Sequence, residues 1–126
     1  MKSVKDYLEG SPEERELLGL LYGWSGARAD IFMFLLRTGE EMTVDELSKH
    51  VERERSTVYR AAENLTEESC VEKSREPVEN GGYRKVYSAP EDDEIEQDMK
   101  LTVSELEDRA IEQVEEVAQQ YESETV

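Results

Sequence analysis

The stretch TVDELSKHVERERSTVYRAAENLTEESCVEKSREPVENGGYRKVYSA, residues 43–89, contains two short helical patterns followed by two strand patterns. The first helix opens at Thr43, whose hydroxyl can accept from the amide three residues on, while Glu46 can reach back to the Thr43 amide. Val44 and Leu47 then begin an apolar edge. The opening therefore predicts a capping box followed by a helix that packs along one side.

The second helical pattern, from about residue 54 to residue 68, has two unlike faces. Its apolar residues recur at i, i+3, i+4 and i+7, a spacing that gathers them on an inward face: Val58, Ala61, Ala62 and Leu65. Hydroxyls, a phenol and arginines open the other face, and such groups contact phosphates and base edges when a helix enters a major groove. A solvated face with incidental arginines is the alternative. The predicted recognition residues are Arg53, Arg55, Ser56, Thr57, Tyr59 and Arg60.

The remainder of the stretch predicts a β-hairpin. Residues 77–82 are dense in turn formers, and residues 83–89 are rich in aromatic and β-branched side chains. Asn80-Gly81-Gly82 supplies the positive φ angles that a tight reversal needs. A hairpin with basic side chains suits a phosphate backbone, although it can equally cover the edge of the core. Its basic residues are Lys73, Arg75, Arg84 and Lys85.

Two helices and a hairpin in this order predict a winged helix-turn-helix. The predicted fold class is mainly α with a small β-hairpin, extended by a long C-terminal helix. We expect a DNA-binding domain over residues 1–90, a coiled-coil dimerisation helix over 91–122 and a frayed tail over 123–126.

Four segments resemble the winged-helix domain of TrmB-type archaeal transcription regulators and, more broadly, the MarR and PadR groups. The resemblance covers about residues 15–90 and implies a regulator that binds double-stranded DNA. The segments are LSKHV at 47–51, RSTVYRA at 55–61, LTEESCVEK at 65–73 and GGYRKVY at 81–87.

The chain departs from the family pattern at three places. Glu52 replaces the usual glycine of the turn, Glu54 stands where Pro or another helix starter is common, and Ser69-Cys70 replaces Gly-Leu after the recognition helix. We expect the large sugar-binding domain of the longer TrmB-type proteins to be absent, so the resemblance does not carry their ligand over to this chain.

The N-terminal part predicts three further helices. Residues 1–10 form a short amphipathic pattern that ends at Gly10. Ser11 and Pro12 predict the start of a second helix, whose dense leucines imply burial on more than one side, part of it against a second subunit. A core helix is expected from Ser25 to Gly39.

The C-terminal part predicts a long helix with an apolar seam. The seam residues are spaced 4, 4, 3, 4, 4, 3 and 4 apart, which we interpret as a coiled coil of about four heptads. Packing back on its own domain is the alternative to homodimerisation. A two-fold dimer would set the recognition helices about one DNA turn apart on a palindromic site. The predicted dimerisation residues are Ile95, Met99, Val103, Leu106, Ala110, Val114, Val117 and Tyr121.

Charge is unevenly distributed along the 126 residues. The chain has 32 acidic and 15 basic residues, and the net charge of −17 taken whole argues against a nucleic-acid binder. The segment from Lys49 to Ser88, however, holds eight basic and eight acidic residues. This distribution is typical of a DNA-binding protein from a salt-adapted, halophilic archaeon. An acidic protein-interaction module is the alternative.

The remaining residues predict neither an enzyme nor a metal or cofactor site. Cys70 is a single cysteine, which fits a reducing cytoplasm and a buried filler, with a redox role as the minority interpretation. His50 has no second histidine or nearby cysteine for zinc, so a cap or phosphate contact is more natural. No segment resembles a signal peptide or a membrane span. We therefore expect a cytoplasmic, homodimeric DNA-binding regulator, or alternatively a sensor that uses Cys70 or a pocket near Trp24.

Overall fold

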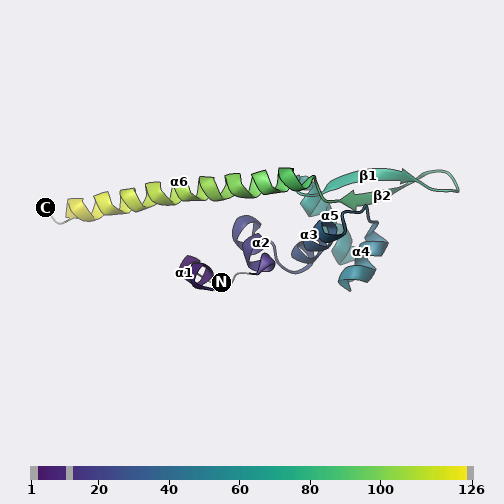
Figure 1. The fold of residues 1–126 in the computed structure, drawn as a ribbon, viewed down its shortest axis with the longest axis horizontal. Helices are drawn as coiled ribbons and strands as arrows, with labels where there is room; N and C mark the ends of the chain where they lie inside the picture. The colour runs from purple at the N-terminus through teal and green to yellow at the C-terminus, as the bar shows by residue number, and fades with distance from the viewer. Residues whose placement is uncertain (1–2, 11–12, 125–126) are drawn as a thin grey trace. The chain divides into compact units, whose positions relative to one another are not determined.

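The structure, a computed structural model, describes residues 3–10 and 13–124. The chain divides into two compact units, Met1–Asp92 and Asp93–Val126. Helices and a single hairpin make up the described residues (Figure 1), which confirms the predicted fold class. The elements are α1 (Val4–Glu9), α2 (Glu14–Tyr22), α3 (Gly26–Thr38), α4 (Val44–Val51), α5 (Arg55–Glu67), β1 (Glu72–Pro77), β2 (Tyr83–Ser88) and α6 (Asp92–Glu124).

Helix α1 forms where the amphipathic pattern predicts it. The Ser3 hydroxyl accepts from the Asp6 amide at 3.1 Å, and the Asp6 carboxylate accepts from the Ser3 amide at 3.2 Å. This capping box compensates two of the unpaired amides of the first turn. Gly10 ends the helix, as predicted.

Helix α2 differs from its prediction. The predicted start at Ser11 and Pro12 lies outside the described residues, and the helix begins at Glu14 after Glu13, which makes no side-chain capping bond. In the single chain Leu18 is buried, Leu17 and Leu21 are half-buried and Leu20 is exposed. The helix contacts α3, and its predicted burial against a second subunit stays a prediction.

Helix α3 is the core helix of the first unit, as predicted. It begins after Ser25 and ends at Gly39, which adopts a left-handed φ of 65°. Ile31, Phe32 and Leu35 are fully buried. The helix contacts α2, α4, α5 and β2, so the other elements of the core assemble around it.

Helix α4 is capped at Thr43 and ends in a turn where Glu52, in place of the usual glycine, adopts the left-handed conformation. The Thr43 hydroxyl accepts from the Glu46 amide at 3.2 Å, as predicted. The other half of the predicted capping box is wrong, because the Glu46 carboxylate accepts from the Thr43 hydroxyl instead of the amide. Glu52 adopts the left-handed conformation at φ 54° and ψ 48°, which costs a non-glycine residue about 1–2 kcal/mol.

Helix α5 buries the face that its spacing predicts: Val58, Ala61, Ala62 and Leu65 are all at most 5% exposed. Glu54 precedes the helix without a side-chain capping bond. Ser69 then adopts a left-handed φ of 62°, and the Cys70 amide donates to the Leu65 carbonyl at 3.0 Å. A second non-glycine residue therefore stands in a conformation that usually favours glycine.

The hairpin pairs β1 and β2 antiparallel, from Glu72 opposite Ser88 to Pro77 opposite Tyr83. Gly81 and Gly82 supply positive φ angles at the reversal, whereas Asn80, also predicted to do so, does not. The predicted turn is thus correct in position, and its two glycines carry the unusual backbone conformation.

An additional backbone bridge ties the hairpin to the start of α4. Met42 and Tyr87 exchange two hydrogen bonds, each 2.8 Å long. Val86 and Tyr87 are both buried although neighbouring residues of a strand face opposite sides. The strand is therefore covered on both faces at this point.

The second unit is the helix α6, which is 33 residues long. Its large apolar side chains from Val103 to Tyr121 are 46–68% exposed, while Ile95 is buried and Met99 half-buried. Among the described residues, no helix is long and apolar enough to cross a membrane.

Candidate nucleic-acid interface

The outer face of α5 is exposed where the sequence predicts recognition residues. Ser56 and Arg60 are exposed, Thr57 is half-buried, and Tyr59 keeps 44% of its surface accessible. The Arg60 guanidinium makes a long hydrogen bond of 3.4 Å to the Ser56 carbonyl on the same helix. Hydroxyl, phenol and guanidinium donors are therefore presented together along two turns of one helix.

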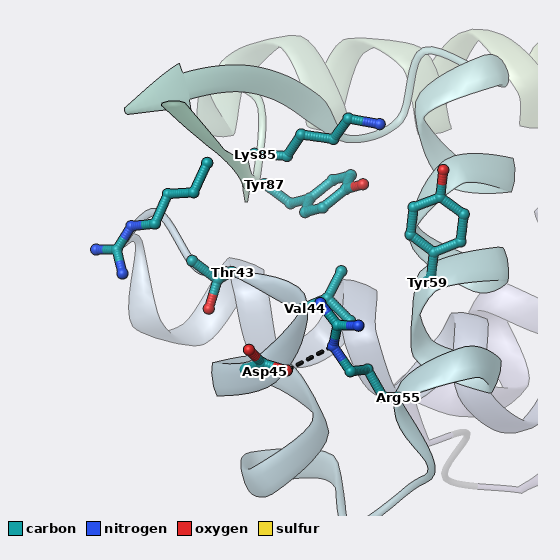
Figure 2. Close-up of a pocket in the computed structure, with 8 residues that line it drawn as sticks. Thr43, Val44, Asp45, Arg55, Tyr59, Lys85 and Tyr87 are labelled. Atoms are coloured by element: carbon teal, nitrogen blue, oxygen red, sulfur yellow. Dashed lines mark hydrogen bonds and ion pairs between the residues drawn. The ribbon is translucent and has the colours of Figure 1, made fainter. Parts of the chain in front are cut away.

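A pocket of about 300 Å³ opens between α5, the start of α4 and strand β2 (Figure 2). Its lining brings together predicted residues of both the recognition helix and the hairpin. The Lys85 ammonium lies 5.6 Å from the centre of the Tyr59 ring, within reach of a cation–π interaction. The lining residues are Thr43, Val44, Asp45, Arg55, Tyr59, Arg84, Lys85 and Tyr87.

Carboxylates of the same chain already hold several of the pocket cations. Arg55 donates from Nε to Asp45 at 2.6 Å, and Figure 2 shows this pair at the edge of the pocket. Arg84 donates to Glu76 across the hairpin at 3.0 Å. Both pairs are largely exposed, so each contributes at most about 1 kcal/mol to stability. These ion pairs hold the two guanidinium groups in position, and breaking either pair costs little free energy.

Arg53 has a structural role in the first unit. Its Nε and Nη2 both donate to one oxygen of Asp30 at 2.9 Å, and Arg15 pairs with the other oxygen. Asp30 is only 16% exposed at its side chain. Arg53 therefore joins the turn after α4 to α3, and its guanidinium is less available than those on α5.

Glu63 joins the recognition helix to the hairpin. Its carboxylate accepts from the Tyr87 hydroxyl at 2.7 Å and from the Lys73 ammonium at 3.0 Å, with Lys85 at 3.8 Å. The Tyr87 hydrogen bond, followed by Lys73 and Lys85, lowers the pKa of Glu63 despite an opposing effect of burial. Burial, together with Glu63, raises the pKa of the Tyr87 hydroxyl. The cluster fixes the angle between α5 and β2 by polar contacts.

Two cations of the predicted interface hold no carboxylate among the described residues: Arg60 on α5 and Arg75 on β1. The other five each pair with an aspartate or glutamate. Arg60 and Arg75 can therefore bind an external anion directly. The other five cations must first break an ion pair with a carboxylate of the chain.

Some residues at this site were not predicted from the sequence, and two of them, Asp45 and Glu63, pair with predicted cations. Thr43, Asp45, Glu63 and Tyr87 belong to the pocket or its support, yet none stands among the predicted site residues. The signal available in the sequence was weak, because an acidic residue in so acidic a chain carries little information. The tertiary contacts that select these four come from separate elements.

Cys70 and Trp24, the two residues named for an alternative sensor role, lie outside the lining of this pocket. Cys70 is buried, with its sulfur 3.4 Å from the Glu68 carbonyl oxygen. Trp24 is buried against the rings of Tyr22 and Phe32, and its Nε1 donates to Glu68 at 2.8 Å. Within the described part of the chain, no group of three or more His, Cys, Asp or Glu residues could hold a metal ion.

His50 lies at the end of α4, where its expected contact with a cap or a phosphate stays a prediction. Its ring is exposed and stacks on Phe34, with ring centres 4.6 Å apart and planes 22° from parallel. The structure therefore gives the imidazole an aromatic neighbour at the end of α4.

A helix-turn-helix followed by a hairpin, with exposed donors on the second helix, defines a winged-helix protein of the type used by transcription regulators. The family model described as "Sugar-specific transcriptional regulator TrmB" matches residues 21–91. The chain belongs to the TrmB family and is a transcription regulator by family and fold.

Three archaeal proteins are among those to which this chain is similar. The uncharacterized protein MJ1503 of Methanocaldococcus jannaschii is 27% identical over 89 residues, which span 71% of this chain and 67% of that protein. A possible transcriptional regulator from Methanosarcina mazei has a solved structure with a TM-score of 0.73 and 22% identity, covering 80% of this chain and 85% of that one. The ST1889 protein of Sulfolobus tokodaii gives a TM-score of 0.63 at 16% identity, covering 77% and 94%. At these identities the two structures support the fold alone.

Proposed function

We propose that this chain is a sequence-specific regulator that binds double-stranded DNA as a homodimer in a high-salt cytoplasm. The observation that carries the proposal is the exposed donor face of α5 beside a cation-lined pocket at the base of the hairpin. Family membership supports a role in transcription regulation. No step in this role requires a cofactor.

Helix α5 would enter the major groove with its N-terminal half. Arg55, Ser56, Thr57, Tyr59 and Arg60 would contact base edges or nearby phosphates, since guanidinium groups match guanine O6 and N7 in pairs. Arg53 would lie along the flanking backbone while it stays bound to Asp30. The positioning contacts through Glu63 support this role, because they hold the hairpin at a set angle to α5.

The pocket would receive a backbone phosphate. Arg55, Arg84 and Lys85 line it, and the Thr43 hydroxyl lies at the start of α4, where backbone amides favour an anion. The phosphate would replace Asp45 and Glu76 as the partner of the two arginines. Lys73 and Arg75 on β1 would follow the phosphates beside the minor groove.

High salt changes which interactions supply the affinity. Counterion release contributes less when the bulk salt is already concentrated, so shape fit, base contacts and pairing of two protomers must contribute more. The exposed apolar seam of α6 supports a dimer, because a second copy can cover it. Its exposed members are the predicted residues from Val103 to Tyr121, whereas Ile95 is buried and Met99 half-buried in the single chain.

Fluorescence anisotropy tests the DNA-binding proposal. The protein would be titrated against duplex DNA from its own upstream region and against an unrelated duplex, in high potassium chloride. We expect selective binding, and Arg60→Ala weakens it by about 1–3 kcal/mol because a base or phosphate contact is lost. Arg37→Ala is the matched control, since Arg37 is also exposed but lies at the end of α3. Equal, negligible binding of both duplexes by folded protein contradicts the proposal.

A second variant should act in the opposite direction. Asp45→Asn removes the carboxylate that holds Arg55 and thereby frees a guanidinium for phosphate. We expect tighter binding to both duplexes by up to about 1 kcal/mol, the range of an exposed ion pair. Unchanged or weaker binding shows that Arg55 does not contact DNA through this pocket.

A protein-interaction module is the second candidate. The specific observation in its favour is that five of the seven predicted cations already pair with carboxylates of the same chain. The anisotropy titration separates the two functions, because such a module would bind neither duplex.

A further inference from the structure

The apolar seam of α6 has a spacing that reads the same in both directions. From Met99 to Tyr121 its members are 4, 3, 4, 4, 3 and 4 residues apart, and Ala110 stands in the middle. The spacing repeats every eleven residues instead of seven, which corrects the heptad interpretation. A repeat of eleven matches a nearly straight helix more closely than a heptad does. Two straight helices can thus keep the seam in contact over its whole length.

The seam occupies a narrow side of the helix. With about 100° between successive residues, its members from Met99 to Tyr121 lie within a sector of about 80°. The larger side chains among them are substantially exposed: Val103, Leu106, Val114 and Val117 range from 46% to 68%. One side of a second helix would cover a surface of this width.

Acidic residues avoid this side. Between Met99 and Ser123 the helix has seven acidic residues, and six lie at least about 120° around the helix from the middle of the sector. Glu107 is the exception. The positions that flank the seam on one side include the uncharged Thr102, Gln113 and Gln120. A second copy of the same acidic helix can therefore approach this side without meeting a row of like charges.

The start of α6 distinguishes the two possible orientations. Five of the seven residues from Asp92 to Asp98 are acidic. A parallel pair in register would place two such clusters side by side, and Glu96, which lies on the seam side of the helix, would face its own counterpart. An antiparallel pair puts the clusters at opposite ends. Electrostatic repulsion therefore favours the antiparallel arrangement.

We propose that α6 pairs with α6 of a second copy in antiparallel orientation, with the two-fold axis at Ala110. The small alanines meet at the axis and allow close approach of the helices. Leu106 then packs against the partner's Val114, Val103 against the partner's Val117, and Met99 against the partner's Tyr121. Lys100 comes level with residue 120 of the partner helix, next to the partner's Glu122. This inference rests on the homodimer of the proposed function.

The orientation has a consequence for the spacing of the two DNA-binding units. At about 1.5 Å per residue, the starts of the two antiparallel helices lie about 50 Å apart along their common axis. A parallel pair would bring them to the same end. One turn of DNA is about 34 Å, so the orientation of α6 bears directly on the half-site spacing.

Disulfide cross-linking tests the orientation. Cys70→Ala supplies a cysteine-free background, and circular dichroism checks that each variant is folded. Val103→Cys and Val117→Cys chains are unfolded and refolded together, oxidised mildly and separated on a non-reducing gel. We expect a covalent dimer from the mixture and none from either chain alone. In the antiparallel pair, residue 103 lies about 21 Å along the axis from its own counterpart, beyond disulfide reach.

Two outcomes would overturn the inference. A covalent dimer from Val103→Cys alone would establish parallel pairing. Ala110→Cys cross-links in either orientation, so its failure to form a covalent dimer would show that α6 does not pair with itself. DNA anisotropy on the uncross-linked protein is independent of both results, and it separates a wrong orientation from a protein that does not bind DNA.

Discussion

The helix-turn-helix with its hairpin and the C-terminal helix use charge in opposite ways. From Lys49 to Ser88 basic and acidic residues are equal in number, and the cations there hold carboxylates across elements. Helix α6 carries thirteen acidic and two basic residues. Within this helix Lys100 forms an ion pair with Glu96. In the first region ion pairs fix charged side chains between elements. In the second, acidic residues lie mainly on the sides of the helix away from the seam.

The first unit and α6 also differ in how they bury apolar residues. The first unit buries its largest apolar side chains around α3, whereas α6 leaves its seam exposed from Val103 to Tyr121 in the single chain. Stability of the first unit therefore depends on internal packing, and in the proposed dimer a second copy covers the exposed part of the seam. Changes in the two regions should act on different measurements.

The largest expected effect comes from the core of α5. Leu65 is fully buried, so Leu65→Ala lowers the free energy of unfolding by about 2–5 kcal/mol. Trp24 is the single tryptophan and is buried in the first unit, which makes its fluorescence the measurement of choice in a denaturant titration. Leu106→Ala, at an exposed seam position, is the control and should change the same transition by less than about 1 kcal/mol. Equal shifts would refute the division into two regions.

The next effect concerns salt. Raising potassium chloride from 0.1 M to 1 M shortens the screening length from about 10 Å to about 3 Å and weakens repulsion between two acidic helices. We expect the dissociation constant of the dimer to fall about tenfold, or about 1.4 kcal/mol, in sedimentation velocity. Binding of DNA by the first unit of each protomer should weaken over the same range, because phosphate contacts are screened. A dimer that dissociates as salt rises would contradict the role given to α6.

The smallest effect concerns the polar link between α5 and β2. Tyr87→Phe removes the hydrogen bond to Glu63 and should lower the free energy of unfolding by about 0.5–1.5 kcal/mol. The hydrogen bond is the main reason that the pKa of Glu63 lies below 4.5 in the folded state. The ionised carboxylate therefore stabilises the fold above pH 4.5, and this contribution is lost as the pH falls through the lowered pKa.

The variant should consequently lose less stability than the parent between about pH 5 and pH 3, as Trp24 fluorescence can measure. On the alkaline side, the raised pKa of the Tyr87 hydroxyl means that the parent loses stability as the pH rises above 10.0. The phenylalanine variant lacks that loss. Identical pH profiles for the two proteins would show that Glu63 and Tyr87 are not coupled.

Periodicity in the sequence was sufficient to predict the central elements. The buried face of α5 follows from four residues at helical spacing, and the hairpin from the Gly81-Gly82 reversal. The position of the turn at Glu52 was predicted from its resemblance to the family, although glycine is absent. These features are local, so a short window of sequence contains the information that determines them.

Features that depend on distant residues were not predicted. The Met42–Tyr87 bridge involves one residue pair and leaves no repeating pattern. The partners of Arg55 and Lys73 lie ten residues away on other elements, and their choice among many acids depends on tertiary placement.

The Met42–Tyr87 bridge bears on the thermodynamics of complex formation. Two backbone hydrogen bonds of 2.8 Å tie the segment before α4 to the base of the hairpin. A ligand that spans α5 and the hairpin would then meet a surface whose parts are already in place. Its heat-capacity change on binding is expected to reflect burial of the contact surface, without the larger negative value that accompanies coupled folding.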